Sequence, residues 1–269
     1  MICIIPQHAK SVRLPGKAFK DLCGIPLVAW SVIQARSAHC IDKVYVSTES
    51  QEIADICGPL GAEIIWRPKW LTDKAFSASV PVEHALKTLG HGVEKIPFMT
   101  KLATGPLLQP GDIDRLYAAF MAAPDPPAGI NKQALLACET QEGGVYRKYR
   151  EGEGYNLGRW VYFDKSHETI DVFASMNIAY EHTYFPGNRT AEWLYGDGAV
   201  NDADADQDMV FHATVLGNGI FHYAQCELWQ LVEIDDEKGL DLCRKLMDLY
   251  ILKGRGTAVY DEYAAQKKT

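Results

Sequence analysis

"MICIIPQHAKSVRLPGKAFKDLCGIPLVAWSVIQARSA", residues 1–38, places an apolar run, a basic loop and a segment with helical periodicity one after another. Residues 1–5 are a continuous apolar run, which is typical of a buried strand. Residues 25–38 repeat apolar side chains at helical spacing and predict the first helix. The loop between them concentrates positive charge in a chain that is acidic overall. The stretch therefore predicts a strand–loop–helix unit with a basic loop.

The alternation of strands and helices continues to about residue 140. Further strands are expected at residues 42–48, 62–66, 96–103 and 134–140. Further helices are expected at residues 50–61, 80–90 and 111–123. Strands that alternate with helices imply right-handed crossovers and a mostly parallel sheet. We therefore predict an α/β fold with a doubly wound, Rossmann-like sheet.

After about residue 140 the regular pattern fades into segments rich in glycine, charge and aromatic residues. We expect a small protruding arm, for dimerisation or as a lid, at about residues 141–170. A strand at residues 171–182 should return to the core, and a polar excursion at about 183–210 is typical of lids or oligomer contacts. Residues 226–252 predict a closing strand, an acidic turn and a C-terminal helix. We expect one domain over residues 1–269 that carries these insertions.

The composition excludes several functional classes. The chain of 269 residues has 27 basic and 35 acidic residues and a net charge of −8, which argues against binding to nucleic acid. No apolar run approaches the roughly 20 residues that cross a bilayer, so no membrane partner is expected. The N-terminus is too short and polar for a signal peptide. The 7 cysteines show no CxxC spacing, which fits a reducing cytoplasm and offers no zinc site.

The basic loop has the chemistry of a phosphate site. In an open α/β sheet, ligands bind beyond the carboxyl ends of the strands, where this loop is expected. Gly16 lets the backbone approach a ligand closely, Pro15 stiffens the turn, and Lys17 supplies a mobile charge. The loop matches neither the Walker motif nor the GxGxxG fingerprint. The alternative from composition alone is a solvated basic loop.

The loop and several later segments resemble, in order, the signatures of one enzyme family. Residues 5–17, IPQHAKSVRLPGK, resemble the IPARxxSxRLPGK signature of the cytidylyltransferases that activate acidic sugars, the CMP-sialic acid (N-acylneuraminate) and CMP-KDO synthetases. Residues 41–68 are similar to the segment that contains VSTD and ends in RP, and residues 101–114 to LQPTSPLRxxeDID. Residues 231–247, LVEIDDEKGLDLCRKLM, resemble xxDIDteeDlexAexll. The resemblance covers residues 1 to about 120 and 225–248, and implies a nucleotidyltransferase fold.

This resemblance implies a reaction and a set of site residues. The anomeric hydroxyl of an ulosonic acid would attack the α-phosphate of CTP and displace pyrophosphate, with Mg²⁺ as cofactor. The implied catalytic residues are Lys17, Arg13 and Asp235. The implied nucleotide-binding residues are His8, Lys10, Ser11, Arg13, Gly16, Lys17, Arg67 and Ser77. Thr104 and Asn177 would face the sugar, and Glu233 and Asp235 would hold the metal ion.

Two acidic segments compete as the metal site. Glu233 and Asp235 are two residues apart, so on a strand both would point to the same face and could share one ion. Residues 201–208, NDADADQD, also alternate carboxylates, from Asp202 to Asp208. No apolar helix of the family type follows that run, whereas one follows Asp235. We favour the Glu233 and Asp235 pair and interpret the run at 201–208 as a solvated loop.

The chain departs from the family pattern in the basic loop, on the sugar side and in the terminal acidic motif. His8 stands where the family has arginine, Ala18 where it has asparagine, and Leu102 where it has glutamine. The third acid of the terminal motif is Gly239. These changes leave two alternatives open. The chain could act on a sugar 1-phosphate or use another NTP, or it could be an inactive nucleotide-binding paralogue.

A homodimer is also implied by the resemblance. The segment with Arg147, Lys148 and Arg150 among aromatic residues is similar to one that reaches across a dimer in this family. The alternative for that segment is an exposed basic hairpin without a function. We expect CTP or another NTP and a small sugar as the binding partners.

Overall fold

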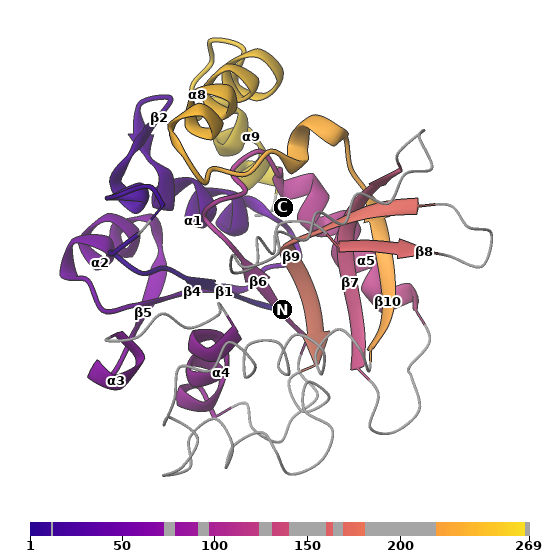
Figure 1. Cartoon of the computed structure of the whole chain (residues 1–269), viewed down its shortest axis with the longest axis horizontal. Helices are drawn as coiled ribbons and strands as arrows, with labels where there is room; N and C mark the ends of the chain where they lie inside the picture. The colour runs from indigo at the N-terminus through magenta and orange to yellow at the C-terminus, as the bar shows by residue number, and fades with distance from the viewer. Residues whose placement is uncertain are drawn as a thin grey trace, which may run out of the picture.

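A mixed sheet with helices on both faces forms the centre of the fold (Figure 1). The computed structural model describes residues 1–11, 13–72, 79–90, 97–123, 131–139, 160–163, 169–180 and 219–266. Within these residues the sheet has eight strands, in the order β10-β7-β9-β6-β1-β4-β5, with β8 paired to β9. The strands are β1 (Ile2–Pro6), β4 (Lys43–Thr48), β5 (Ala62–Trp66), β6 (Pro97–Lys101), β7 (Asn131–Glu139), β8 (Trp160–Phe163), β9 (Thr169–Tyr180) and β10 (Gly219–Gln225).

The N-terminal half of the sheet is parallel. Strand β1 lies between β4 and β6 and runs parallel to both, and β4 runs parallel to β5. Strand β9 is antiparallel to β6 on one side and to β7 on the other, and β10 is parallel to β7. The predicted α/β fold with a mostly parallel sheet is therefore confirmed, with β9 returning to the core as expected.

Helices and short turns connect these strands. The α-helices are α1 (Leu27–Ser37), α2 (Gln51–Cys57), α3 (Lys69–Thr72), α4 (Ser79–Thr88), α5 (Pro110–Ala122), α8 (Glu237–Leu246) and α9 (Ala258–Gln266). A 3₁₀ turn, η1 (Lys17–Phe19), and a two-stranded hairpin, β2 (Asp21–Leu22) and β3 (Ile25–Pro26), precede α1. Helix α2 begins as predicted at a serine cap, because the Ser50 hydroxyl accepts a hydrogen bond from the Ile53 N–H at 3.3 Å.

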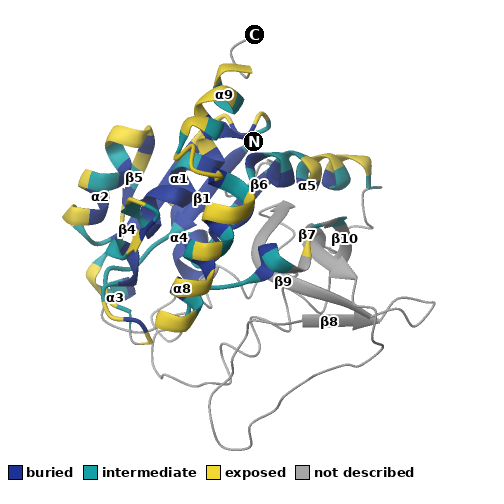
Figure 2. Cartoon of the chain, turned by 90° about the horizontal axis from the view of Figure 1, so that it is seen from above, coloured by how far each residue is buried: buried dark blue, intermediate teal, exposed yellow. Residues whose placement is uncertain are grey.

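Alternate residues of the central strand β1 pack into two separate core layers, one on each face of the sheet. Cys3 and Ile5 pack with side chains of α1, α2 and α5 on one face of the sheet. Ile2 and Ile4 pack with side chains of α4 on the other face. Successive side chains of a strand point to opposite faces, so an unbroken apolar run is what a strand covered on both sides requires. Figure 2 shows the resulting pattern, with buried strands inside and exposed outer faces on α2, α4 and α8.

The C-terminal helices dock on α1 through a third apolar cluster. Trp30 of α1 is fully buried and lies against Tyr260 of α9, with their ring centroids 5.6 Å apart. The Trp30 indole N–H donates to the carbonyl of Leu22 at 2.8 Å, which ties the β2–β3 hairpin to the same cluster. Leu240 of α8 and Ile234, from the segment before it, are fully buried there. The chain end is thereby held next to the loops that follow β1 and β6.

The second half of the chain departs from prediction at its closing strand. The closing strand predicted within residues 226–252 is wrong in position, because the strand β10 ends at Gln225 and a 3₁₀ turn, η4 (Leu228–Leu231), follows. The acidic turn and the helix after it are present, and a π-helical turn (Met247–Leu252) and α9 extend the chain further. Most of the predicted arm at 141–170 and the whole excursion at 183–210 lie outside the described residues. In the described part of the chain no helix is long and apolar enough to cross a membrane.

Candidate functional site

The candidate site lies at the edge of the sheet where the parallel strands end. The basic loop leaves β1 at this edge, and the loops after β4, β5 and β6 lie beside it. The segment 232–236, before α8, reaches the same edge, because the Ile234 N–H donates to the Thr104 carbonyl at 2.9 Å. The Ile234 side chain is buried in the core, and the acidic residues on either side of it, Glu233 and Asp235, are partly buried at this edge.

Lys17 and Arg13 of the basic loop meet Asp235, which is more than 200 residues away in sequence. Lys17 Nζ lies 3.1 Å from Asp235 Oδ1, and Arg13 Nη1 lies 2.7 Å from Asp235 Oδ2. The Lys17 side chain is largely buried, whereas the Arg13 side chain is 62% exposed. Gly16, with φ +65°, adopts the left-handed conformation that turns the chain into η1 and places Lys17 at its start. The structure thus brings all three predicted catalytic residues into direct contact.

Glu233 lies within electrostatic reach of this cluster. Burial, and then the neighbouring Asp235 carboxylate, raise the pKa of Glu233 to about 7, although Lys17 and Arg13 act in the opposite direction. No ion pair to Glu233 is present among the described residues. A carboxylate whose pKa is raised by a neighbouring carboxylate marks a place where an additional cation would be stabilised. A set of three or more histidine, cysteine, aspartate or glutamate metal ligands does not occur in the described residues.

The route by which the two acids meet differs from the prediction. The prediction that Glu233 and Asp235 lie on one strand and point to the same face is wrong, because residues 232–234 are not part of any strand in the described sheet. The burial of Ile234 and its backbone bond to Thr104 hold the pair in place instead. There is also no room for the family's third acid, since a Cβ atom on Gly239 would lie 2.8 Å from the carbonyl oxygen of Glu233.

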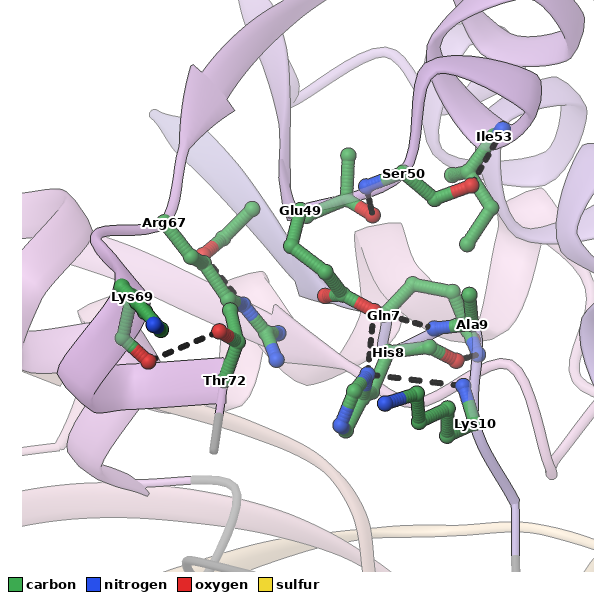
Figure 3. A network of polar contacts seen from close by, with 12 residues as sticks. Gln7, His8, Ala9, Lys10, Glu49, Ser50, Ile53, Arg67, Lys69 and Thr72 are labelled. Carbon is green, nitrogen blue, oxygen red and sulfur yellow. Dashed lines mark hydrogen bonds and ion pairs between the residues drawn. The ribbon is translucent and has the colours of Figure 1, made fainter. Parts of the chain in front are cut away.

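A second polar cluster surrounds the start of the basic loop (Figure 3). Oε1 of Glu49, the residue after β4, contacts His8 Nδ1 and accepts the Ala9 N–H at 2.8 Å. Arg67, just after β5, donates from Nε to the Ser47 hydroxyl at 3.1 Å. Burial lowers the pKa of Arg67 to about 10, while the Glu49 charge opposes this shift. The cluster therefore joins the ends of β1, β4 and β5, and it includes two of the predicted nucleotide-binding residues, His8 and Arg67.

The turn after β6, which carries Thr104, is anchored through three consecutive carbonyl groups. The Thr104 carbonyl accepts from Ile234 N–H, the Gly105 carbonyl from Lys101 Nζ at 3.2 Å, and the Pro106 carbonyl from Gln34 Nε2. Lys101 is fully buried, and burial lowers its pKa to about 8. The turn beside the site is therefore held by the C-terminal segment, by β6 and by α1 at once.

The remaining predicted site residues lie on the basic loop, on β9 or outside the described residues. Lys10 is exposed and Ser11 is partly buried on the same loop. The backbone of Asn177 on β9 lies in register with Thr100 of β6, near the end of that strand. Ser77 and the acidic run at 201–208 lie outside the described residues.

Sequence reasoning missed two polar residues of the site. Glu49 and Lys101 both lie at or just beyond the carboxyl end of a strand of the parallel sheet. A signal for each was available, because an acid directly after a predicted strand, and a lysine at the end of an apolar strand, mark the ligand-binding edge. The partners of these residues, His8 and Gly105, could not be read from sequence spacing.

A separate cavity of about 490 Å³ lies between the start of α5 and the C-terminal helices. Trp229, Tyr250, Tyr260 and Arg115 are among the residues that line it. None of the predicted site residues belongs to its lining. The cavity is therefore distinct from the candidate site.

Comparison with known proteins gives the chain a family match. A family model described as cytidylyltransferase matches residues 2–139, slightly more than half of the chain. A pseudaminic acid cytidylyltransferase of Campylobacter jejuni is 30% identical over 122 residues, which cover 45% of this chain and 53% of that protein. A 3-deoxy-manno-octulosonate cytidylyltransferase of Chlorobium luteolum is 32% identical over 139 residues, covering 52% of this chain and 50% of that protein. The chain thus spans about half the length of these curated relatives.

This chain is also similar to a further relative over a shorter segment and to a solved structure. A CMP-N,N'-diacetyllegionaminic acid synthase of Legionella pneumophila is 39% identical over 66 residues, 24% of this chain and 28% of that protein. The solved structure of a CMP:2-keto-3-deoxy-manno-octonic acid synthetase in complex with CTP is similar in fold, with a TM-score of 0.61 and 16% identity. That similarity covers 91% of this chain and 97% of the other.

Proposed function

This chain belongs to the cytidylyltransferase family, and we propose that it transfers CMP from CTP to an acidic, ulosonic sugar with release of pyrophosphate. The observation that carries the proposal is the contact of Lys17 and Arg13 with Asp235 at the carboxyl edge of the sheet. Two cations of one loop and an acid from the far end of the chain meet at that edge, where α/β folds bind nucleotides.

The reaction asks the protein for positioning and charge neutralisation rather than for a covalent intermediate. In the proposed complex Lys17 and Arg13 bind triphosphate oxygens, and the N–H groups of the basic loop add further donors. The Asp235 carboxylate contacts both cations and so orients them at the site. Preoriented charges of this kind stabilise developing negative charge without the cost of reorganising water.

Mg²⁺ is part of the proposal, with Glu233 and Asp235 as the residues that would hold it. The structure fits such an ion because burial and Asp235 together raise the pKa of Glu233 to about 7. A hard divalent ion prefers carboxylate oxygens, and it would relieve the repulsion between the two acids. When bound, the ion would neutralise charge on the phosphate oxygens.

The acceptor proposed here follows from the names of the relatives. Those relatives are named for pseudaminic acid, N,N'-diacetyllegionaminic acid and 3-deoxy-manno-octulosonate, all of which are acidic sugars. Thr104 and Asn177 are proposed to lie beside the sugar, because both are placed near the end of β6. The substitutions at Ala18 and Leu102 make the choice among acidic sugars an experimental question.

The test is a pyrophosphate-release assay with four NTPs against a panel of acidic sugars and sugar 1-phosphates. Release that requires both CTP and an acidic sugar supports the proposal. Release with a sugar 1-phosphate alone would support the alternative acceptor, and CTP binding without any release would indicate an inactive paralogue. Lys17→Ala should lower the rate by about 100-fold or more, as loss of a charge-stabilising donor does. Lys43→Ala, which removes an exposed lysine paired with Glu63, is the matched control and should leave the rate unchanged.

The proposal also includes a homodimer and a cytoplasmic location. It rests on the resemblance of the segment with Arg147, Lys148 and Arg150 to one that crosses a dimer in this family, and on the absence of CxxC spacing among the cysteines. Light scattering coupled to size-exclusion chromatography would measure the mass in solution. A monomeric mass at micromolar concentration would contradict the dimer.

A further inference from the structure

The Glu49 carboxylate, which is not part of the basic loop, contacts the first residues of that loop. Its Oε1 atom accepts the Ala9 N–H at 2.8 Å and contacts His8 Nδ1 (Figure 3). The loop is held at its base as well, because Gln7 N–H donates to the Ser47 carbonyl at 2.9 Å. Glu49 itself follows β4 directly, and the His8 and Glu49 side chains are only 28% and 19% exposed. The orientation of His8 is therefore set by a neighbouring strand end.

The identity of the contacting atoms determines which imidazole tautomer is present. Burial alone would raise the pKa of Glu49, but hydrogen bonds from Ala9, from its own backbone and from His8 together lower it. The carboxylate is therefore ionised at neutral pH, and an ionised carboxylate can only accept hydrogen bonds. His8 Nδ1 must then carry the hydrogen. The Lys10 N–H also lies 3.4 Å from Nδ1, and this longer contact is not a hydrogen bond in that state, because a protonated Nδ1 has no free lone pair to accept it.

This assignment leaves Nε2 of His8 as the nitrogen that faces away from Glu49. In a neutral imidazole with hydrogen on Nδ1, Nε2 is only an acceptor and offers nothing to a phosphate oxygen. In the protonated ring, Nε2 also carries a hydrogen and can donate to phosphate with a positive charge. A fixed arginine at this position would make no such distinction, because its guanidinium is always charged.

We infer that Glu49 is a positioning residue that makes triphosphate binding at His8 depend on uptake of one proton by the imidazole. The inference rests on the proposed function, since it assigns His8 to the same nucleotide site. The ligand class is a nucleoside triphosphate, and CTP is the probe. Affinity for CTP should accordingly fall as the pH rises and the imidazole loses this proton.

Lys10 and Arg67 are further charged residues of the described cluster that contains His8 and Glu49 (Figure 3). Lys10 on the same loop is exposed, and Arg67 at the end of β5 lies beyond Glu49 and interacts electrostatically with that carboxylate. Arg67 remains cationic across the neutral range, since burial lowers its pKa only to about 10. The proton-dependent charge on the phosphate side of this cluster is therefore that of His8.

The experiment is isothermal titration of CTP in the absence of sugar, from about pH 5.5 to 8.5. For wild type, a one-proton linkage raises the Kd by up to about tenfold per pH unit at the alkaline end. The terminal phosphate of the nucleotide titrates in the same range, so the informative quantity is the difference in slope between variants. The slope is that of log Kd for CTP against pH. For His8→Arg this slope should be lower by one proton than for wild type, because the arginine charge does not change with pH.

Glu49→Gln separates positioning from a merely structural role. The glutamine amide can donate to Nδ1, which allows the neutral tautomer with hydrogen on Nε2 to bind phosphate. The dependence of log Kd on pH should therefore also weaken in Glu49→Gln. The amide oxygen of the glutamine can still accept the Ala9 N–H, so the loop keeps that hydrogen bond. His39→Gln removes a histidine paired with Asp114 at 2.9 Å on other elements and should keep the wild-type slope. If Glu49→Gln fails to fold, as judged by circular dichroism, His8→Arg carries the test alone.

Equal slopes for wild type, His8→Arg and Glu49→Gln would overturn the inference and leave the proposed function intact. Equal proton uptake by these proteins, measured in buffers of different ionisation enthalpy, would overturn it in the same way. If wild type bound no NTP at any pH, both the inference and the proposed function would fail.

Discussion

Replacing Lys101 with methionine should change how the stability of this protein depends on pH. Lys101 is fully buried at the end of β6, and the Gly105 carbonyl, 3.2 Å away, is its hydrogen-bond acceptor. Burial lowers its pKa from 10.5 to about 8, with Cys3 and Asp112 opposing the shift. The folded state therefore releases this proton more readily than the unfolded chain does. Stability contributed by this group is present at high pH and is lost as the pH falls from about 10.5 through about 8.

The magnitude follows from the two pKa values. One pKa unit corresponds to 1.36 kcal/mol, so keeping Lys101 protonated in the folded state costs ~3 kcal/mol at neutral pH. About 1 kcal/mol of this cost should disappear between about pH 7 and pH 9. Methionine has a similar length and no charge, but it leaves the Gly105 carbonyl without its donor, which costs ~1–3 kcal/mol. The two effects nearly cancel at neutral pH, so the pH slope is the informative quantity.

The assay is urea unfolding of wild type and Lys101→Met at about pH 7, 8 and 9. We expect the stability of wild type to rise relative to that of the variant by ~1 kcal/mol over this range. Cys3 interacts with Lys101, but burial raises its pKa to about 12 and loss of Lys101 would raise it further, so in both folded proteins this thiol stays protonated up to about pH 9. Parallel stability curves for the two proteins would refute the reasoning, because Lys101 would then keep its proton equally in both states.

Three further substitutions test the acidic segment. Asp235→Asn should lower CTP turnover by about 100-fold, measured by pyrophosphate release, and a rate within a factor of two of wild type would remove Asp235 from the site. Burial and the Asp235 carboxylate raise the pKa of Glu233 to about 7, so stability is lost as the pH rises from about 4.5 to about 7. Glu233→Gln should remove ~2 kcal/mol of that loss in urea unfolding at about pH 5 and 7, and an unchanged difference would contradict the assigned shift. Gly239→Ala should cost ~1–3 kcal/mol, because the new Cβ would lie 2.8 Å from the Glu233 carbonyl oxygen. A wild-type melting temperature for that variant would show that the segment around Glu233 shifts to accommodate the new Cβ atom at little cost in stability.

The order of elements in the first half of the chain could be predicted because its determinants are local. An apolar run such as residues 2–5, a serine before a helix, or apolar side chains at helical spacing report on their immediate neighbourhood. Strands that alternate with helices then leave few arrangements open, because parallel crossovers are right-handed. The failure at residues 226–234 has the same origin, since the apolar side chains there face a tertiary cluster and their pattern does not distinguish a strand from an extended coil.

The sequence by itself determined the α/β class, the basic loop and the candidate acids, because residue types and short-range periodicity carry that information. Only the tertiary structure decided which of these groups meet. Asp235 reaches Lys17 and Arg13 because buried Ile234 and the docking of α8 and α9 on α1 bring the chain end back to β1. Glu49 reaches His8 because β4 lies beside β1 in parallel register. Contacts across 41 to 222 positions of sequence depend on how whole elements pack, and no local pattern encodes that packing.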